Sequence, residues 1–304
     1  MPDTLIVSEE NLGLRLDKLL AQQFPEHSRS YFQYLIDEKH VLLNGHPVKK
    51  QHRPLAGDEI AIAFQDVPNL DVKPEAIPLD IVYEDAHIIA VNKPVGMVVH
   101  PAPGAYTGTF ANALMYHCKE LNPDEFEKTR PGIVHRLDKE TSGLLIGAKT
   151  LEAHKKLTEA FSKREVQKRY LAICCGIPKE GECSAPIKRH PIKRKQMTVS
   201  AEGKEALTRF KILARKDGLS LIEAELVTGR THQIRVHLKH LNCPVLGDNT
   251  YGNQTLNQKY GALRQMLHAH QVQLKHPISE VSLELVAPIP TDLKNFIELI
   301  QKLD

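Results

Sequence analysis

One short loop places three polar side chains between two apolar runs. In Gly132-Ile-Val-His-Arg-Leu-Asp-Lys-Glu-Thr-Ser-Gly-Leu-Leu-Ile146, we expect one apolar strand to enter and a second to leave. The loop between them carries His135, Arg136 and Asp138. A loop framed by sheet strands can hold a carboxylate rigidly at the mouth of a cleft. Asp138 is therefore a candidate functional carboxylate, and the alternative is an ordinary turn or cap residue.

A second stretch, Thr228-Gly-Arg-Thr-His-Gln-Ile-Arg-Val-His237, combines a helix start with cationic side chains. We expect a short helix over residues 231–241, in which His232 and Arg235 share a face. Exposed backbone amides and two arginines, Arg230 and Arg235, at a helix N-terminus suit a phosphate or a carboxylate. The alternative is a surface helix with ordinary charges. The turn from Gly247 to Gly252 follows, and we expect it to shape the rim of the cleft.

The charge of the chain is concentrated in one segment. The formal net charge is +3, but residues 186–216 hold ten Lys and Arg and two Glu, a net charge of +8. This segment includes Lys193 and Arg194. A concentrated positive segment on a nearly neutral protein suits a polyanionic partner. A solvated lysine-rich loop is the alternative.

Several function classes are disfavoured by what the sequence lacks. The dinucleotide, P-loop, nucleophile-elbow and zincin signatures are all missing. The histidine pairs 268/270 and 237/240 lack an evident third ligand, so a catalytic metal is not expected. Five cysteines without a C-x-x-C pattern fit a reducing cytoplasm. The longest apolar run has about eight residues, too few for a membrane span, and no secretory signal is recognised.

The elements that must position these residues indicate an α+β fold with a largely antiparallel sheet. Residues 1–66 are expected to form a small module, with an apolar helical stripe (Leu12, Leu16, Leu19, Leu20), a second helix capped by Ser28, and a hairpin at Asn44-Gly45. A proline-containing linker is expected over residues 67–78, and the main domain over 79–304. In that domain we expect strands at 81–83, 87–91, 166–175, 206–214, 219–227, 267–274 and 281–286. Helices are expected at 110–121, 151–163, 231–241 and 291–303.

Together these motifs resemble the RluA-type family of pseudouridine synthases. The matching runs are Tyr83-Glu-Asp with Val91-Asn-Lys-Pro-Val-Gly-Met, His135-Arg-Leu-Asp-Lys-Glu-Thr-Ser-Gly, Lys168-Arg-Tyr-Leu-Ala and Thr228-Gly-Arg-Thr-His-Gln-Ile-Arg-Val-His. The N-terminal module resembles an S4 RNA-binding domain through Arg15-Leu-Asp-Lys-Leu-Leu, Ser28-Arg29 and Val41-Leu-Leu-Asn-Gly. Within the family, residues 100–104 and 186–197 look most like the enzymes that modify large-subunit (23S) ribosomal RNA.

The resemblance implies roles for individual residues. Asp138 would be the catalytic carboxylate, Tyr170 the aromatic ring beside it, and Arg235 the ion-pair partner of Asp138. Arg136 would help to displace the target base. Taken alone, Tyr170 at the start of a strand is equally a core residue. Substrate contacts are expected from Arg136, His135, Arg230, His232, Lys193 and Arg194.

The reaction that the family catalyses is an isomerisation without redox change or loss of a group. It needs one ionised carboxylate, and we expect no cofactor and no metal. The expected partner is ribosomal RNA of the large subunit or its assembling precursor, bound by a cytoplasmic monomer, with no DNA and no membrane. The rival interpretations are a non-catalytic RNA-binding or ribosome-assembly protein and a metal-dependent hydrolase.

Overall fold

The computed structural model describes residues 3–27, 29–65, 72–101, 105–119, 121, 126 and 130–301. The chain divides into two compact units, Met1–Leu70 and Asp71–Asp304. The predicted module boundary at residue 66 and the first part of the predicted linker fall on residues outside the described set, and the exact limits stay predictions. The expected cap Ser28 and residues 102–104 of the 100–104 segment also lie outside the described residues.

The N-terminal unit packs two helices on a small antiparallel sheet, whose strand order is β1-β4-β2-β3. Its elements are β1 (Asp3–Ile6), the 3₁₀ turn η1 (Glu9–Asn11), α1 (Leu16–Gln23), α2 (Arg29–Asp37), β2 (Val41–Leu43), β3 (His46–Pro47) and β4 (Glu59–Ile62). The helices bury Leu16, Leu19, Leu20, Phe32 and Leu35 against Ile60 and Ile62. Leu12, expected on the first helical stripe, instead ends η1 and is 48% exposed.

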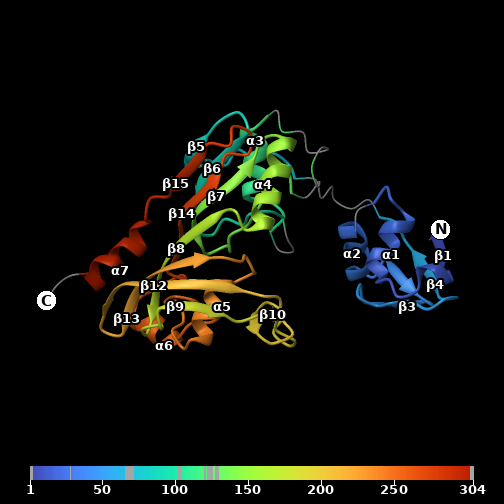
Figure 1. The fold of residues 1–304 in the computed structure, drawn as a ribbon. Coiled ribbons are helices and arrows are strands. Elements are labelled where there is room, and N and C mark those ends of the chain that lie inside the picture. The colour runs from blue at the N-terminus through green and yellow to red at the C-terminus, as the bar shows by residue number, and fades with distance from the viewer. Residues whose placement is uncertain are drawn as a thin grey trace. The chain divides into compact units, whose positions relative to one another are not determined.

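The second unit is built on one large twisted sheet (Figure 1). Its strands are β5 (Ile81–Glu84), β6 (Ile88–Lys93), β7 (Ser142–Ala148), β8 (Gln167–Cys175), β9 (Gly181–Ser184), β12 (Leu207–Lys216), β13 (Leu219–Leu226), β14 (Leu267–Lys275) and β15 (Ser282–Val286). A separate hairpin joins β10 (Ile187–Arg189) and β11 (Met197–Val199). The helices are α3 (Phe110–His117), α4 (Leu151–Lys163), α5 (Gln233–His240), α6 (Gln254–Tyr260) and α7 (Thr291–Gln301).

The sheet runs in the order β5-β6-β7-β14-β8-β13-β12-β9, and β15 also pairs with β14. Every pairing is antiparallel except that of β7 with β14. The predicted α+β class with a largely antiparallel sheet is therefore confirmed. At the parallel pair the backbones approach closely, because a side chain at Gly143 would overlap the carbonyl oxygen of Ala269.

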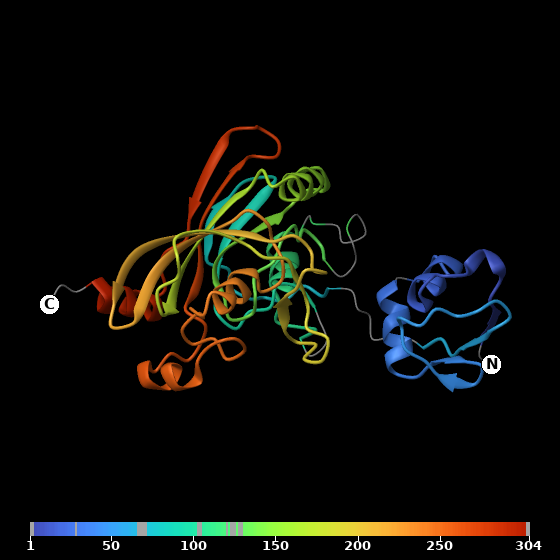
Figure 2. The ribbon, with the colours of Figure 1, turned by 60° about the horizontal axis from the view of Figure 1, so that its bottom comes forward.

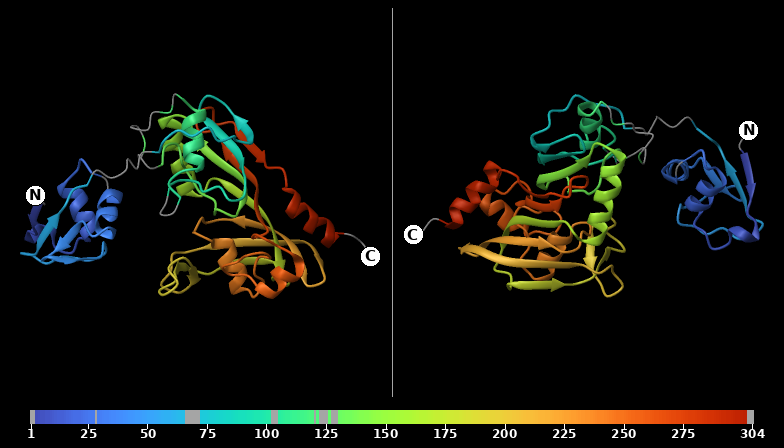
Figure 3. Two further views of the ribbon diagram at one scale, coloured as in Figure 1. Left: turned by 180° about the vertical axis from the view of Figure 1, so that it is seen from behind. Right: turned by 45° about the horizontal axis from the view of Figure 1, so that its top comes forward.

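Alternating side chains give the sheet two buried faces. Along β6, Ile88 and Ala90 pack with α4 residues, whereas Ile89 and Val91 pack with α3 residues. Because successive side chains of a strand point to opposite faces, this period of two places one helix on each side. The same alternation in β8 turns Leu171 toward α7, which lies at the other end of the sheet from α4 (Figures 1 and 2). Figure 3 shows α3 and α4 beside β6 and β7 from behind.

Three predicted elements differ from the structure. The strand expected before the Asp138 loop is a single bridge between Ile133 and Gly147, since the chain there turns at Gly132 with φ +69°. Helix α5 begins at Gln233, because the preceding His232 adopts a left-handed conformation (φ 58°) that a helix cannot include. Helix α3 ends at His117, before the expected residue 121. Among the described residues, no helix is long and apolar enough to span a bilayer.

Candidate active site

A cleft of about 580 Å³ opens beside strand β8. It is lined by the loop before β7, the end of α4, the start of β8 and the segment from β13 into α5. Seven of the predicted site residues line it: His135, Arg136, Asp138, Tyr170, Arg230, His232 and Arg235. Lys193 and Arg194 are not among the described residues that line it. The two sequence motifs that carry candidate catalytic and binding residues therefore meet in one cleft.

Arg235 links two carboxylates in the cleft wall. Its Nη1 donates to Asp138 Oδ2 at 2.8 Å, and its Nε and Nη2 donate to Asp248 at 2.7 and 2.9 Å. The side chain of Asp248 is fully buried, that of Arg235 is 7% exposed, and that of Asp138 is 18% exposed. Asp248 thus fixes the guanidinium in a fork, and the guanidinium fixes Asp138 at the solvent-accessible end.

The backbone around Asp248 explains how a bare carboxylate can be buried there. Besides the guanidinium, Asp248 Oδ1 accepts hydrogen bonds from the backbone N–H groups of Thr250 and Tyr251 at 2.8 and 3.0 Å. Gly247 precedes it with φ +78°, and a side chain at Gly247 would overlap the Arg264 carbonyl group. A buried charge is tolerated when it is paired and hydrogen-bonded in this way.

The electrostatics keep Arg235 charged. Burial alone would lower the pKa of Arg235, but its hydrogen bonds and charge contacts with Asp248 and Asp138 outweigh burial and raise the pKa. The ring of Tyr251 lies 5.0 Å from the guanidinium carbon, which adds a cation–π contact. A permanent positive charge therefore faces Asp138 at 2.8 Å.

Asp138 is also held through its own loop. Its backbone carbonyl accepts from the N–H of Thr141 at 3.1 Å. The next residue, Lys139, offers its carbonyl to the buried ammonium of Lys93 at 3.2 Å. Lys93 Nζ also donates to the carbonyls of Pro94 and Met97, and burial lowers its pKa to about 8. The loop is thus pinned to the end of β6.

Tyr170 stands on the cleft face of β8 between small neighbours. It pairs with Ala224 on β13 and with Ala269 on β14, so both flanking positions leave room for the ring. Burial, with the nearby charge of Asp138, raises the pKa of Tyr170 well above its ordinary value. The phenol is therefore neutral at physiological pH, and its ring forms part of the cleft wall.

The remaining predicted residues differ in how they are held. His135 accepts the Ile146 N–H at Nε2 (2.8 Å) and stacks on Phe161, and burial lowers its pKa to about 3. His232 Nε2 faces Asp138 Oδ1 at 3.8 Å. Arg230 Nε donates to the Glu205 carbonyl at 2.9 Å. Arg136 is exposed and makes no hydrogen bond or ion pair within the described residues, so its guanidinium is available to a ligand.

Lys193 and Arg194 lie in the exposed loop of the β10–β11 hairpin. The same +8 segment continues into β12, where Arg209 pairs with Glu182 and Glu225. Part of its charge is thus neutralised within the chain. The hairpin loop keeps exposed positive charge at Lys193 and Arg194. The strand that follows the loop, β11, packs in one apolar cluster with Val236 of α5.

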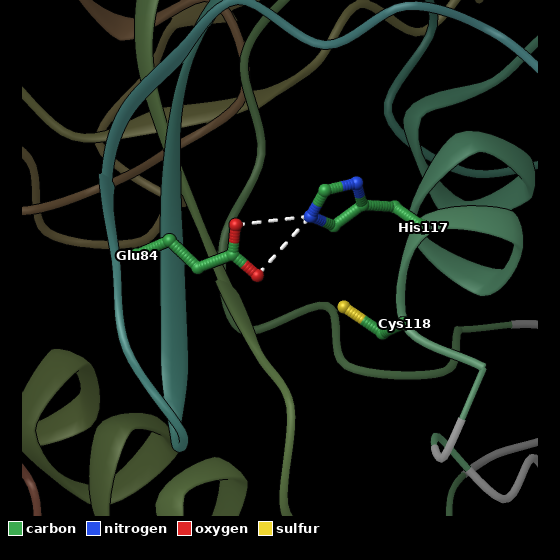
Figure 4. A group of neighbouring side chains, drawn as sticks. All are labelled: Glu84, His117 and Cys118. Atoms are coloured by element: carbon green, nitrogen blue, oxygen red, sulfur yellow. Dashed lines mark hydrogen bonds and ion pairs between the residues drawn. The ribbon is translucent and has the colours of Figure 1, made fainter.

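One further group of side chains in the described part of the chain could hold a metal ion. Glu84 of β5 and His117 and Cys118 at the end of α3 point toward one another, with their ligand atoms within 4.8 Å (Figure 4). The carboxylate already pairs with His117 at 2.9 Å and with Lys149 at 2.6 Å. Because Lys149 and His117 already bond Glu84 and the Lys149 ammonium would repel a metal, we interpret the group as a hydrogen-bonded ion-pair cluster. It lies outside the cleft lining, and it includes neither histidine pair considered from the sequence.

The geometry agrees with comparisons against known proteins. The model of the RNA pseudouridylate synthase family matches residues 87–240, which contain Asp138, Tyr170 and Arg235. The chain belongs to the RNA pseudouridylate synthase family. It is therefore an isomerase that acts on uridines in RNA, as the motifs predicted. The S4 domain model matches residues 14–60, which confirms the predicted nature of the N-terminal module.

Full-length relatives extend this result. An uncharacterised RNA pseudouridine synthase of Bacillus subtilis, YlyB, is 41% identical over 300 residues, covering 98% of both chains. The ribosomal large subunit pseudouridine synthase D of Escherichia coli K12 is 41% identical over 310 residues, covering 98% of this chain and 94% of its own. Among solved structures, human RNA pseudouridylate synthase domain containing 4 has a TM-score of 0.58 at 27% identity, covering 73% of this chain and 92% of its own.

Sequence reasoning missed several residues of this synthase cleft. Asp248 was expected only to shape a rim, because nothing in a Gly-Asp turn shows that its carboxylate is buried against an arginine. Lys168, however, left a signal, since it lies two residues before Tyr170 on a predicted strand and so shares its face. The structure places Lys168 in the cleft lining, where its ammonium lies 5.6 Å from the Phe161 ring and burial lowers its pKa.

Proposed function

We propose that this synthase converts specific uridines of large-subunit (23S) ribosomal RNA to pseudouridine, with Asp138 as the catalytic carboxylate. The observation that carries the residue assignment is the carboxylate of Asp138, held at 2.8 Å by a buried arginine at a solvent-accessible cleft. The substrate assignment is supported by relatives from several bacteria named ribosomal large subunit pseudouridine synthase D, at 41–42% identity over nearly the whole chain.

The chemistry requires no outside reactant. The N1–C1′ bond of uridine breaks, a C5–C1′ bond forms, and the proton that leaves C5 is balanced by one taken up at N1. Asp138, oriented by Arg235, acts as a nucleophile or assists loss of a sugar proton. Attack at uracil C6, attack at ribose C1′ and formation of a glycal all remain compatible with this geometry. No electron is exchanged in any of them, so no redox cofactor is needed.

The target nucleotide reaches Asp138 by leaving its stack. Extruding a base costs a few kcal/mol, least in a loop or at a mismatch. Arg136, exposed at the cleft and two residues before Asp138, is suited to fill the vacated space and stack on neighbouring bases. Tyr170 packs against the uracil ring and positions its departing C5 proton. Its raised pKa favours a role as a neutral phenol over one as a phenolate base.

RNA contacts outside the cleft come from cationic side chains. Lys193 and Arg194 of the hairpin loop contact phosphates, and Arg230, His232 and His135 contact the nucleotide at the cleft. The S4 unit adds a second contact region. All five cysteines are buried thiols outside any disulfide, which supports work in the reducing cytoplasm. We expect the enzyme to act as a monomer.

Chemical mapping of pseudouridine in ribosomal RNA tests the proposal. Cells that lack the protein should lose pseudouridine at a small number of large-subunit positions. Complementation with the wild-type chain should restore these positions, and complementation with Asp138→Asn should not. Restoration by Asp138→Asn would instead show that Asp138 is not the catalytic carboxylate. Unchanged large-subunit RNA together with a loss in another RNA would overturn only the substrate assignment.

A further inference from the structure

The hydroxyl of Tyr251 forms hydrogen bonds with two segments, the β10–β11 hairpin and His232 in the cleft. Tyr251 is 7% exposed and follows the Gly247 turn. Its Oη accepts the backbone N–H of Met197, the first residue of β11, at 2.7 Å. The same oxygen lies 2.8 Å from His232 Nδ1. One hydroxyl thus contacts both the hairpin that carries Lys193 and Arg194 and the histidine beside Asp138.

The hydrogen-bond pattern determines the tautomer of His232. A phenol has one proton to donate. Within the described residues, His232 Nδ1 is the acceptor at hydrogen-bond distance from Tyr251 Oη, because the Met197 N–H group is itself a donor. A buried O–H without an acceptor is costly, so Nδ1 must be unprotonated. The ring proton of neutral His232 is then on Nε2, the nitrogen that faces Asp138 Oδ1 at 3.8 Å.

The surroundings keep the imidazole neutral. Burial lowers the pKa of His232, although the charge of Asp138 opposes that shift and that of Arg235 adds to it. A doubly protonated ring would place a proton on Nδ1 against the phenol hydroxyl. The distance of 3.8 Å exceeds that of a hydrogen bond, so the Nε2–H is left for an acceptor atom that enters beside Asp138.

We infer that Tyr251 is a positioning residue, which fixes His232 as an Nε2–H donor toward an acceptor oxygen of the bound uridine and fastens the basic hairpin to the same hydroxyl. The inference rests on the proposed function for the identity of that acceptor. Packing supports the attachment of the hairpin to Tyr251, because Tyr251 shares a small apolar cluster with Ile187 of β10 and Val236 of α5. The cation–π contact with Arg235 needs only the ring, so the hydroxyl has a separable role.

Tyr251→Phe separates the two roles, since it keeps the ring and removes the hydroxyl. We expect turnover to fall about tenfold, as for loss of one well-placed hydrogen bond, with a smaller change in the concentration of RNA needed for half-maximal rate. The matched control is Tyr260→Phe, which removes a hydroxyl bonded to the Asp217 carbonyl outside the cleft lining. Equal turnover in the two variants would overturn the inference.

Nitrogen-15 NMR of the histidine rings tests the tautomer without any substrate. Wild-type protein should show His232 as the Nε2–H form, assigned by its loss in His232→Gln, and Tyr251→Phe should shift the ring toward Nδ1–H. A wild-type ring protonated at Nδ1, or a Tyr251→Phe spectrum unchanged from wild type, would contradict the inference. If the NMR result holds but no RNA is modified by wild-type protein, the proposed function fails and the tautomer assignment stands.

Discussion

Each of the two units of the chain contains a buried aspartate that is ion-paired with arginine, but the ratio of aspartate to arginine differs. It is two to one in the cleft and one to two in the S4 unit. In the cleft, Asp138 and Asp248 share the single guanidinium of Arg235, which is 7% exposed. In the S4 unit, the fully buried Asp17 holds two arginines, Arg15 and Arg29, which are 41% and 48% exposed. The first cluster has a negative charge in excess, and the second has a positive one.

The difference shows how one type of ion pair can serve two purposes. In each cluster the group in the minority is buried and satisfied. Asp138 in the cleft, and Arg15 and Arg29 in the S4 unit, reach solvent with a fixed orientation, whereas Asp248 stays buried. In the cleft the result is an oriented carboxylate for chemistry. In the S4 unit the result is a pair of guanidinium groups, supported also by Gln33, which donates to Asp17 at 2.7 Å. Such groups suit the phosphates of RNA.

Removing the excess charge in the cleft should give the largest effect. Asp138→Asn keeps the shape of the side chain and its contact with Arg235, so the fold should be retained. Turnover should fall on the order of 10⁴-fold, the scale seen when a single catalytic carboxylate is removed, while RNA affinity stays within about twofold. Single-turnover assays and filter binding measure the two quantities. A loss of less than tenfold in turnover would show that another group performs the chemistry.

Removing the minority charge in the cleft should affect stability as well as catalysis. Arg235→Leu leaves Asp248 fully buried without its cation, so the free energy of unfolding of the second unit should fall by about 3–5 kcal/mol. Urea unfolding measures this quantity. Adding Asp248→Asn to the same chain removes the unpaired charge and should recover part of the loss. Equal stability of the single and double variants would show that Asp248 does not depend on Arg235.

The exposed arginines of the S4 unit should affect binding and leave the chemistry unchanged. Replacing Arg29 by Gln, with Arg15 left to pair with the buried Asp17, should weaken RNA binding several-fold at moderate salt. It should also reduce the salt-dependence slope by about one, for one phosphate contact. The rate at saturating RNA should not change. Arg209→Gln is the control, because Glu182 and Glu225 already neutralise that arginine. The same salt slope in both variants would argue against phosphate contacts at Asp17.

The smallest effect concerns the buried carboxylate of the S4 unit. Burial raises the pKa of Asp17, but hydrogen bonds from Arg15, Arg29 and Gln33 outweigh burial and lower it. The stabilisation is therefore present above the unfolded pKa of about 3.9 and is lost as pH falls through the lower folded value. The stability difference between wild type and Asp17→Asn should shrink below about pH 4. Amide exchange in α1 and α2 at several pH values measures it, and a constant difference would contradict the assignment.

Much of the fold could be predicted from local patterns. Helix α4 has the predicted limits, and strands β8, β13, β14 and β15 begin or end within a residue or two of the prediction, because their apolar periodicity is long and uninterrupted. The β9 strand, the β10–β11 hairpin and α6 were not predicted. They are short and polar, and they depend on contacts with distant segments, such as the bond of Met197 with Tyr251.

In the site, too, the contacts that depend on distant segments could not be predicted from the sequence. The residues of the two loop motifs are brought together in the cleft because each motif has a strand or helix to anchor it. The second partner of Arg235 could not be predicted, since Asp248 and Arg235 meet only through the Gly247 turn and its close approach to Arg264. Burial of the Lys93 ammonium likewise depends on three carbonyl groups from two separate loops.

The parallel pairing of β7 with β14 bears on the order in which the chain matures. Ser142 and His268, whose side chains bond across this pair at 2.9 Å, are 126 residues apart. At a synthesis rate of roughly 5–20 residues per second, the ribosome needs about 6–25 s to add that length. Strand β7, which follows the Asp138 loop, therefore lacks its β14 neighbour until most of the polypeptide has been translated. The central sheet of a nascent chain therefore stays incomplete until β14 has emerged from the ribosome.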